Sequence, residues 1–222
     1  MRIKNARELL EDNGDERKPL LEAYNYAINV LELNACKREV IGESKKYSMV
    51  DSNETACKAV IEYLTGADKK SSIYYLGPSV EGSVEAVAED MAQFLVDVSK
   101  GKGEIKPPCY VVFGQKDMKV TLGEQVGYGG KTLEQALRVM LELKGNTRIT
   151  AMFAKTNGTD GTTKAAGAII DYTTFINSTR GINVDAYLKG SESRGILNQG
   201  KALILTGKLN VEKARICIAK II

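Results

Sequence analysis

A glycine-rich segment in the middle of the chain directly precedes a predicted helix. It reads Gly127-Tyr128-Gly129-Gly130-Lys131-Thr132. Glycines ahead of a helix let backbone N–H groups converge on an anion, and the helix N-terminus adds positive potential. The P-loop pattern is not met, because Gln125 stands where that pattern requires its first glycine. We expect Gly129, Gly130 and Lys131 to bind a phosphate or carboxylate; the alternative is a flexible connection between a strand and a helix.

A second polar segment, Thr156–Thr163, follows a predicted strand over 149–154. Ligands of open α/β sheets lie at the carboxyl ends of strands, which is where this segment falls. Its glycines permit close ligand approach, its threonines offer hydroxyls to phosphate or sugar oxygens, and Asp160 can hold a cation or accept a proton. The alternative is a polar turn that caps its own backbone. The candidate ligand-binding residues of this segment are Asn157, Gly158, Thr159, Asp160, Gly161 and Thr162.

Composition restricts the chemistry further. The 222 residues include no histidine and no tryptophan, so Ser-His-Asp catalysis, a histidine base and histidine-ligated metals are excluded. The net charge of +3 is too small to suggest nucleic acid as a partner. Charge is uneven, because residues 101–222 carry eighteen basic and ten acidic side chains. This basic half suits a small anionic or phosphorylated ligand, or it is a solvated face without a specific ligand.

The hydrophobic pattern predicts a mixed β-sheet with flanking helices, an α/β fold, preceded by N-terminal helices. Proline-rich sequence at Pro107-Pro108 marks a boundary near the point where the charge changes sign. The small-residue stretch Ala165–Ala168 suggests close packing against the sheet. Helices are predicted over 4–11, 19–33, 53–65, 81–100 and 131–144, and strands over 72–76, 109–113, 119–122, 149–154, 202–206 and 215–221.

The sequence also bears on location. The first residues lead into polar sequence without a signal-peptide core, and no apolar run is long enough to span a membrane. The four cysteines form no CxxC pair and lie among apolar neighbours, which is typical of reduced, buried thiols. We therefore expect a cytoplasmic protein that does not associate with membranes.

A known family matches these residues. Thr156–Gly161, followed by Lys164–Asp171, resembles the signature of type II glycerate kinases in their C-terminal MOFRL domain. Gly129–Glu134 stands where that family has Gly-Gly-Arg-Asn-Gln-Glu, and Pro107–Cys109 resembles the start of the domain. The resemblance implies three segments: an N-terminal helical segment (1–46), a remnant of the family's first domain (47–105) and a MOFRL-like α/β domain (106–222).

The resemblance also implies a reaction, the transfer of a phosphoryl group from ATP to glycerate, with Mg²⁺, in a cleft between two domains. It assigns catalytic roles to Lys131 and Asp160, and Asp160 is its candidate Mg²⁺ ligand. The departures are specific. Residues 41–50 stand where most of the first domain should be, Lys131 replaces an arginine, and Asn157 replaces an aspartate. Lysine keeps the charge of that arginine but loses its bidentate fork.

Three functions remain open at this point. The chain is a glycerate kinase-like protein, partial or weakly active alone, that needs a separately encoded complementing domain. Alternatively, it is a non-catalytic module that keeps the fold for ligand binding or assembly, including homo-oligomers. The third possibility, an independent enzyme on another substrate, has little support in the sequence. The accumulated substitutions favour the non-catalytic module as the activity of the isolated chain.

Overall fold

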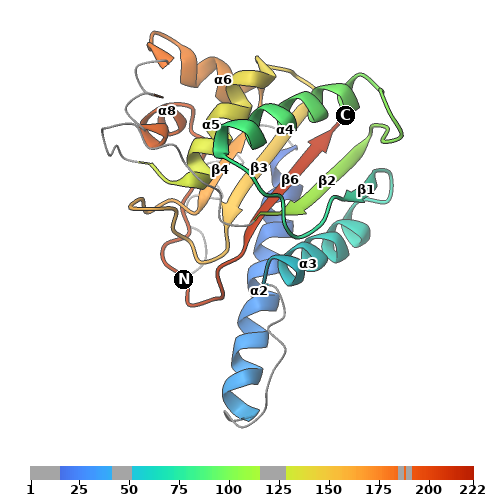
Figure 1. The fold of residues 1–222 in the computed structure, drawn as a ribbon. Helices are drawn as coiled ribbons and strands as arrows, with labels where there is room; N and C mark the ends of the chain where they lie inside the picture. The colour runs from blue at the N-terminus through green and yellow to red at the C-terminus, as the bar shows by residue number, and fades with distance from the viewer. Residues whose placement is uncertain (1–15, 42–51, 116–128, 185–187, 189–191) are drawn as a thin grey trace.

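The computed structural model describes residues 16–41, 52–115, 129–184, 188 and 192–222. One six-stranded sheet forms its centre, with strand order β1-β2-β6-β3-β4-β5 (Figure 1). β1 pairs with β2 in parallel and every other neighbouring pair is antiparallel, so the sheet is mixed. The strands are β1 (Ser72–Tyr75), β2 (Cys109–Gly114), β3 (Ile149–Lys155), β4 (Gly167–Ile170), β5 (Leu203–Ile204) and β6 (Arg215–Ile221).

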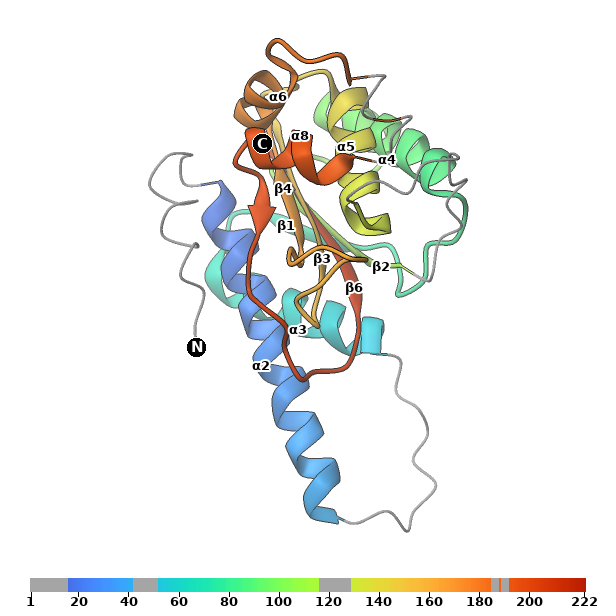
Figure 2. The same ribbon diagram turned by 90° about the vertical axis from the view of Figure 1, so that its left-hand side faces the viewer.

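Helices cover both faces of this sheet. The pair α2 and α3 packs on one face, and α4, α5 and α8 pack on the other (Figure 2). The helix bounds are α2 (Arg17–Ile41), α3 (Ser52–Ala67), α4 (Val84–Ser99), α5 (Lys131–Leu143), α6 (Tyr172–Thr179) and α8 (Ser193–Gln199). The expected α/β fold, a mixed sheet with flanking helices, is confirmed.

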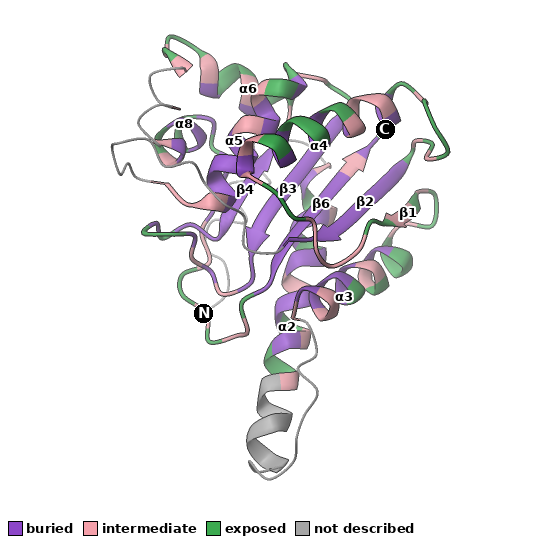
Figure 3. Cartoon of the chain, viewed as in Figure 1, coloured by how far each residue is buried: buried purple, intermediate pink, exposed green. Residues whose placement is uncertain are grey.

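The central strands are buried on both sides, as Figure 3 shows by their colour. Successive side chains of a strand point to opposite faces, so one strand supplies both cores. In β2, Val111 and Phe113 join the core beneath α4 and α5, whereas Tyr110 and Val112 join the core beneath α2 and α3. This double burial explains why β2, β3 and β6 read as continuous apolar runs in the sequence.

The elements differ from the sequence predictions at several points. The second predicted helix is longer, extending to Ile41, and the predicted helix over 81–100 begins only at Val84, where Ser83 caps it. The stretch predicted to pack closely against the sheet is partly strand β4 itself, and α6 and α8 were not predicted. The predicted helix 4–11 and strand 119–122 lie outside the described residues.

The N-terminal helix is part of the same core. Tyr24 of α2 donates a hydrogen bond to the Lys155 carbonyl at 2.7 Å, and buried Arg17 pairs with Asp171 and bonds Thr174. Elements from all three proposed segments thus share one sheet and its two helical layers; the segment boundaries themselves stay a prediction. Among the residues described, no helix is long and apolar enough to cross a membrane.

Candidate functional site

The candidate site lies at one edge of the sheet. β2 and β3 both run antiparallel to β6, so both end at the edge where β6 begins. The segment after β3 carries Asp160, and α5 starts beside it, at the lower edge of the sheet in Figure 1. The topology therefore brings the two glycine-bearing segments together, although they are about thirty residues apart in sequence.

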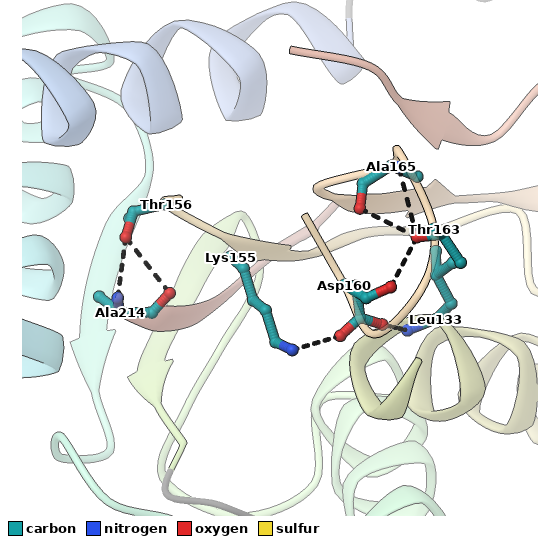
Figure 4. Close-up of polar contacts among 7 residues, drawn as sticks. All are labelled: Leu133, Lys155, Thr156, Asp160, Thr163, Ala165 and Ala214. Carbon is teal, nitrogen blue, oxygen red and sulfur yellow. Dashed lines mark hydrogen bonds and ion pairs between the residues drawn. The ribbon is translucent and has the colours of Figure 1, made fainter. Parts of the chain in front are cut away.

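Asp160 is the most constrained residue of this edge. Its side chain is fully buried. Oδ2 accepts the backbone N–H of Leu133 at 2.8 Å, and Oδ1 pairs with Lys155 Nζ at 2.5 Å (Figure 4). Its own backbone carbonyl accepts the Thr163 hydroxyl at 2.7 Å. Both carboxylate oxygens are therefore engaged by groups of the protein itself.

The Asp160 carboxylate fills the role of a cap for α5. Gly130 precedes the helix and, having no side chain, gives no side-chain cap, whereas Leu133 stands at the third helical position. That position is where a capping oxygen normally accepts a hydrogen bond. A carboxylate here also faces the positive end of the helix dipole. A carboxylate of the protein itself therefore caps this helix N-terminus, and the expected binding of a phosphate or carboxylate ligand there stays a prediction.

Lys155 supplies the positive charge that balances the buried Asp160 carboxylate. It ends β3 and is almost wholly buried, so loss of hydration lowers the pKa of its ammonium, while Asp160 opposes the shift and Arg215 adds to it. A buried carboxylate without a partner is strongly disfavoured, so Lys155 and Asp160 depend on each other. Sequence reasoning missed Lys155, although a lysine at the end of an otherwise apolar strand is a visible signal.

The glycines of the two segments serve close packing of backbone. A Cβ at Gly130 would overlap the Asp160 carboxyl group. Gly161 has a φ of +59°, and a Cβ there would lie 2.7 Å from the Gly129 carbonyl oxygen. Gly129 and Gly130 of one segment therefore pack directly against Asp160 and Gly161 of the other. Side chains at Gly130 or Gly161 would push the two segments apart.

The remaining predicted residues lie around this contact. Lys131 opens α5 and is half-buried, Thr159 is half-buried, and Thr162 is exposed. Asn157 is half-buried, and its Oδ1 has no hydrogen-bond partner. Gly158 is buried and has a φ of +79°, a conformation that favours glycine. Lys131 and the threonines thus remain available at the surface, whereas Asp160 does not.

Mg²⁺ does not fit Asp160 while this pairing holds. Magnesium prefers oxygen ligands in near-octahedral geometry, usually including one or two carboxylates. At Asp160, a lysine ammonium and a backbone N–H occupy the positions that the metal would need. The part of the chain that the structure describes contains no group of three or more histidine, cysteine, aspartate or glutamate residues placed to hold a metal.

A buried polar cluster adjoins Asp160 on the α5 side of the sheet. Gln115 follows β2, Arg215 begins β6 and Lys155 ends β3, so three adjacent strands place them side by side. In each of these strands, every second side chain faces α4 and α5. Gln115, Lys155 and Arg215 fall on this alternation, so their side chains belong to the same face of the sheet. Thr132 and Gln135, both fully buried, lie three residues apart at the start of α5. We call Gln115, Lys155 and Arg215 the buried polar cluster; neither Lys155 nor Arg215 was singled out in sequence.

Comparison with known proteins identifies this region. Residues 109–212 match the model of the MOFRL family. The chain is 28% identical over 172 residues to glycerate 2-kinase of Pyrococcus horikoshii, covering 77% of this chain and 38% of that protein. It is 31% identical over 130 residues to D-glycerate 2-kinase of Thermotoga maritima, covering 56% of this chain and 31% of that protein.

Solved structures with a similar fold come from the same group of proteins. A crystal structure of glycerate kinase from Thermotoga maritima superposes with a TM-score of 0.70 at 24% identity, covering 77% of this chain and 40% of that one. This chain therefore spans well under half the length of these relatives. Its matched segment contains both glycine-bearing loops, and residues 109–212 are a domain of the MOFRL family.

Proposed function

We propose that this chain is a glycerate kinase-like protein that binds a small anionic ligand but does not complete phosphoryl transfer from ATP to glycerate on its own. Its relatives support the kinase-like part of this proposal, because those from Pyrococcus horikoshii and Thermotoga maritima are named glycerate 2-kinases. The second part is supported by Asp160, whose carboxylate is already bound within the protein. Cytoplasmic location and assembly with itself or with a complementing domain belong to the same proposal.

The observation that carries the proposal is the engagement of Asp160. Phosphoryl transfer requires in-line positioning, neutralisation of charge on the transferred group and, usually, Mg²⁺. Asp160 is the acidic residue retained from the family motif, and both of its carboxylate oxygens are bound to Leu133 and Lys155. A carboxylate held in this way neither orients an attacking hydroxyl nor binds a metal.

Lys131 gives the anion-binding part its support. It stands at the first position of α5, half-buried, next to the glycines of the preceding segment. Its ammonium would neutralise a phosphate or carboxylate approaching from solvent, as a point charge without the bidentate geometry of arginine. The chain thus retains charge for binding while lacking the means for transfer.

An NMR titration tests this proposal at Asp160. The chain is labelled with ¹³C and the Asp160 side-chain carboxyl resonance is followed as Mg²⁺, then ATP, then glycerate are added. We expect the chemical shift of this resonance to stay unchanged, because the carboxylate remains bound to Lys155 and to the Leu133 N–H at the start of α5. The same titration with Mn²⁺ provides a control, since a paramagnetic ion broadens nearby resonances. A shift with Mg²⁺ together with selective broadening by Mn²⁺ at Asp160 would contradict the proposal.

A further inference from the structure

The end of β3 is tied to the N-terminal helix α2 by a buried hydrogen bond. Tyr24 of α2 is fully buried, and its hydroxyl donates to the backbone carbonyl of Lys155 at 2.7 Å. The same carbonyl also accepts the Gly158 N–H, over a longer distance of 3.3 Å. The Tyr24 hydroxyl is therefore the closer of these two donors, and it comes from a residue 131 positions away in the sequence.

The packing of α2 gives this hydroxyl a fixed place. Leu20, Tyr24 and Ile28 follow each other at four-residue spacing, so they share one side of the helix, and all three are buried in the core against the sheet (Figure 2). Burial raises the pKa of the Tyr24 phenol above its ordinary value, although a hydrogen bond with Thr206 opposes the shift. The hydroxyl therefore keeps its proton and remains a donor.

Lys155 connects this restraint to the start of α5. Its ammonium pairs with one carboxylate oxygen of Asp160, and the other oxygen accepts the Leu133 N–H at 2.8 Å (Figure 4). Leu133 lies in the first turn of α5, two residues after Lys131. A continuous series of contacts thus runs from α2, through the end of β3 and Asp160, to the helical turn that carries Lys131.

The charge at this edge of the sheet depends on the same series. Asp160 is a fully buried carboxylate, and Lys155 balances its charge. While the two are paired, the Lys131 ammonium attracts an approaching anion; if they separate, the negative charge of Asp160 opposes that anion. Displacement of the Lys155 backbone should therefore weaken anion binding at Lys131, although Lys155 itself does not contact the ligand.

We propose that Tyr24 is a positioning residue of the candidate site, whose hydroxyl fixes the end of β3 so that Lys155 stays paired with Asp160 beside Lys131. The consequence for binding rests on the anion binding proposed above. The inference extends the site to a residue of the N-terminal helix, outside residues 109–212 that match the MOFRL family.

Tyr24→Phe tests this role, because it removes the hydroxyl and keeps the ring that fills the core. The Asp160 side-chain carboxyl resonance of the ¹³C-labelled chain is compared between variant and wild type without ligand, and it should move because the ion pair is displaced. The Lys131 and Leu133 amide resonances are then followed as inorganic phosphate is added at constant ionic strength. The dissociation constant for phosphate should rise roughly two- to tenfold, which corresponds to the loss of one hydrogen bond.

A second tyrosine of the same helical layer provides the matched control. Tyr63 of α3 donates an exposed hydrogen bond to Glu22 at 2.9 Å. Tyr63→Phe should leave both the Asp160 resonance and the phosphate dissociation constant as in the wild type. Tyr24→Met, which also fills the core without a hydroxyl, carries the same test if Tyr24→Phe does not fold.

The two measurements separate this inference from the proposed function. An unmoved Asp160 resonance in the Tyr24 variant, or an unchanged dissociation constant for phosphate, would overturn the inference and leave the proposed function standing. If phosphate shifts neither amide resonance of the wild-type chain, the proposed anion binding at Lys131 fails. The Asp160 resonance, which is read without ligand, then still decides whether Tyr24 positions the ion pair.

Discussion

At the scale of single residues, the Asp160 carboxylate shows how one side chain serves the fold in two ways. It satisfies a backbone N–H at the start of α5 and balances the buried charge of Lys155. A buried ion pair contributes little net stability compared with apolar packing, but removal of one partner leaves the other charge uncompensated. The two residues should therefore respond to mutation as a unit.

Replacement of Asp160 by asparagine tests this interdependence. Asp160→Asn keeps an oxygen for the Leu133 N–H but leaves Lys155 without its counter-charge, so the free energy of unfolding should fall by about 3 kcal/mol. Urea denaturation measures the change. The exposed control Asp90→Asn should change stability by less than about 0.5 kcal/mol.

The double variant Asp160→Asn with Lys155→Met sharpens the same test. Because it removes both buried charges, it should recover most of the stability lost in the single variant. Equal loss in single and double variants would show that Lys155 and Asp160 are not coupled.

At the scale of elements, α2 is attached to the sheet at its first turn. Arg17 is fully buried, pairs with Asp171 and donates to the Thr174 hydroxyl at 2.6 Å. Asp171 caps α6 by accepting the Thr174 N–H at 2.8 Å, so one ion pair joins the start of α2 to the start of α6. Loss of this pair should loosen both helices.

Arg17→Met is expected to lower the free energy of unfolding by about 3 kcal/mol, because it leaves the Asp171 carboxylate partly buried without its guanidinium. Urea denaturation at pH 7 measures the loss. The control is Glu54→Gln, which breaks the exposed Lys58–Glu54 pair and should cost less than about 1 kcal/mol. Equal effects of the two substitutions would contradict the assignment of Arg17 as an anchor.

The same pair gives a defined dependence on pH. Burial alone would raise the pKa of Asp171, but Arg17 and the Thr174 bonds outweigh it and hold the pKa below the ordinary 3.8. A lowered carboxyl pKa adds stability that is complete above the unfolded-state value and is lost as pH falls through the folded-state value. Stability of the wild-type chain should therefore drop below about pH 4. Asp171→Asn should flatten that part of the curve, and an unchanged acid limb would contradict the assignment.

The sequence predicted some elements well for a physical reason. β2, β3 and β6 are buried on both faces, and such strands are continuous apolar runs that sequence alone reveals. β4 was missed because Gly167 and Ala168 carry little hydrophobic signal. The fold requires a glycine at 167, because a Cβ there would overlap the backbone of β3. α6 was missed because its threonines and serine show no clear helical period.

The candidate site was predictable only in part. Local patterns placed Gly130 and Asp160 at a helix start and a strand end, and the structure brings both to one edge. The Lys155–Asp160 pair arises from a tight turn between them, and the proximity of Gln115 to Arg215 arises from the non-local pairing of β2 with β6. Such contacts depend on strand order, which residue types and spacing do not specify.

At the scale of the whole molecule, the described residues form a three-layer fold, and the chain matches only part of its relatives. Helices cover both faces of the six-stranded sheet. The chain spans 38% of its Pyrococcus horikoshii relative and 31% of its Thermotoga maritima relative. The described residues thus correspond to only one part of these relatives. The proposed separation of binding from phosphoryl transfer rests on the state of Asp160 in this part.

The central claim is tested most directly by measuring phosphoglycerate formation by the purified chain with ATP, Mg²⁺ and glycerate. The D-glycerate 2-kinase of Thermotoga maritima, assayed alongside at equal molar concentration, serves as the positive control. We expect the control to produce phosphoglycerate and this chain to produce none above the rate without protein. Sustained turnover by this chain alone, abolished by Asp160→Asn, would contradict the claim that Asp160 is held by the fold and that the chain is catalytically incomplete.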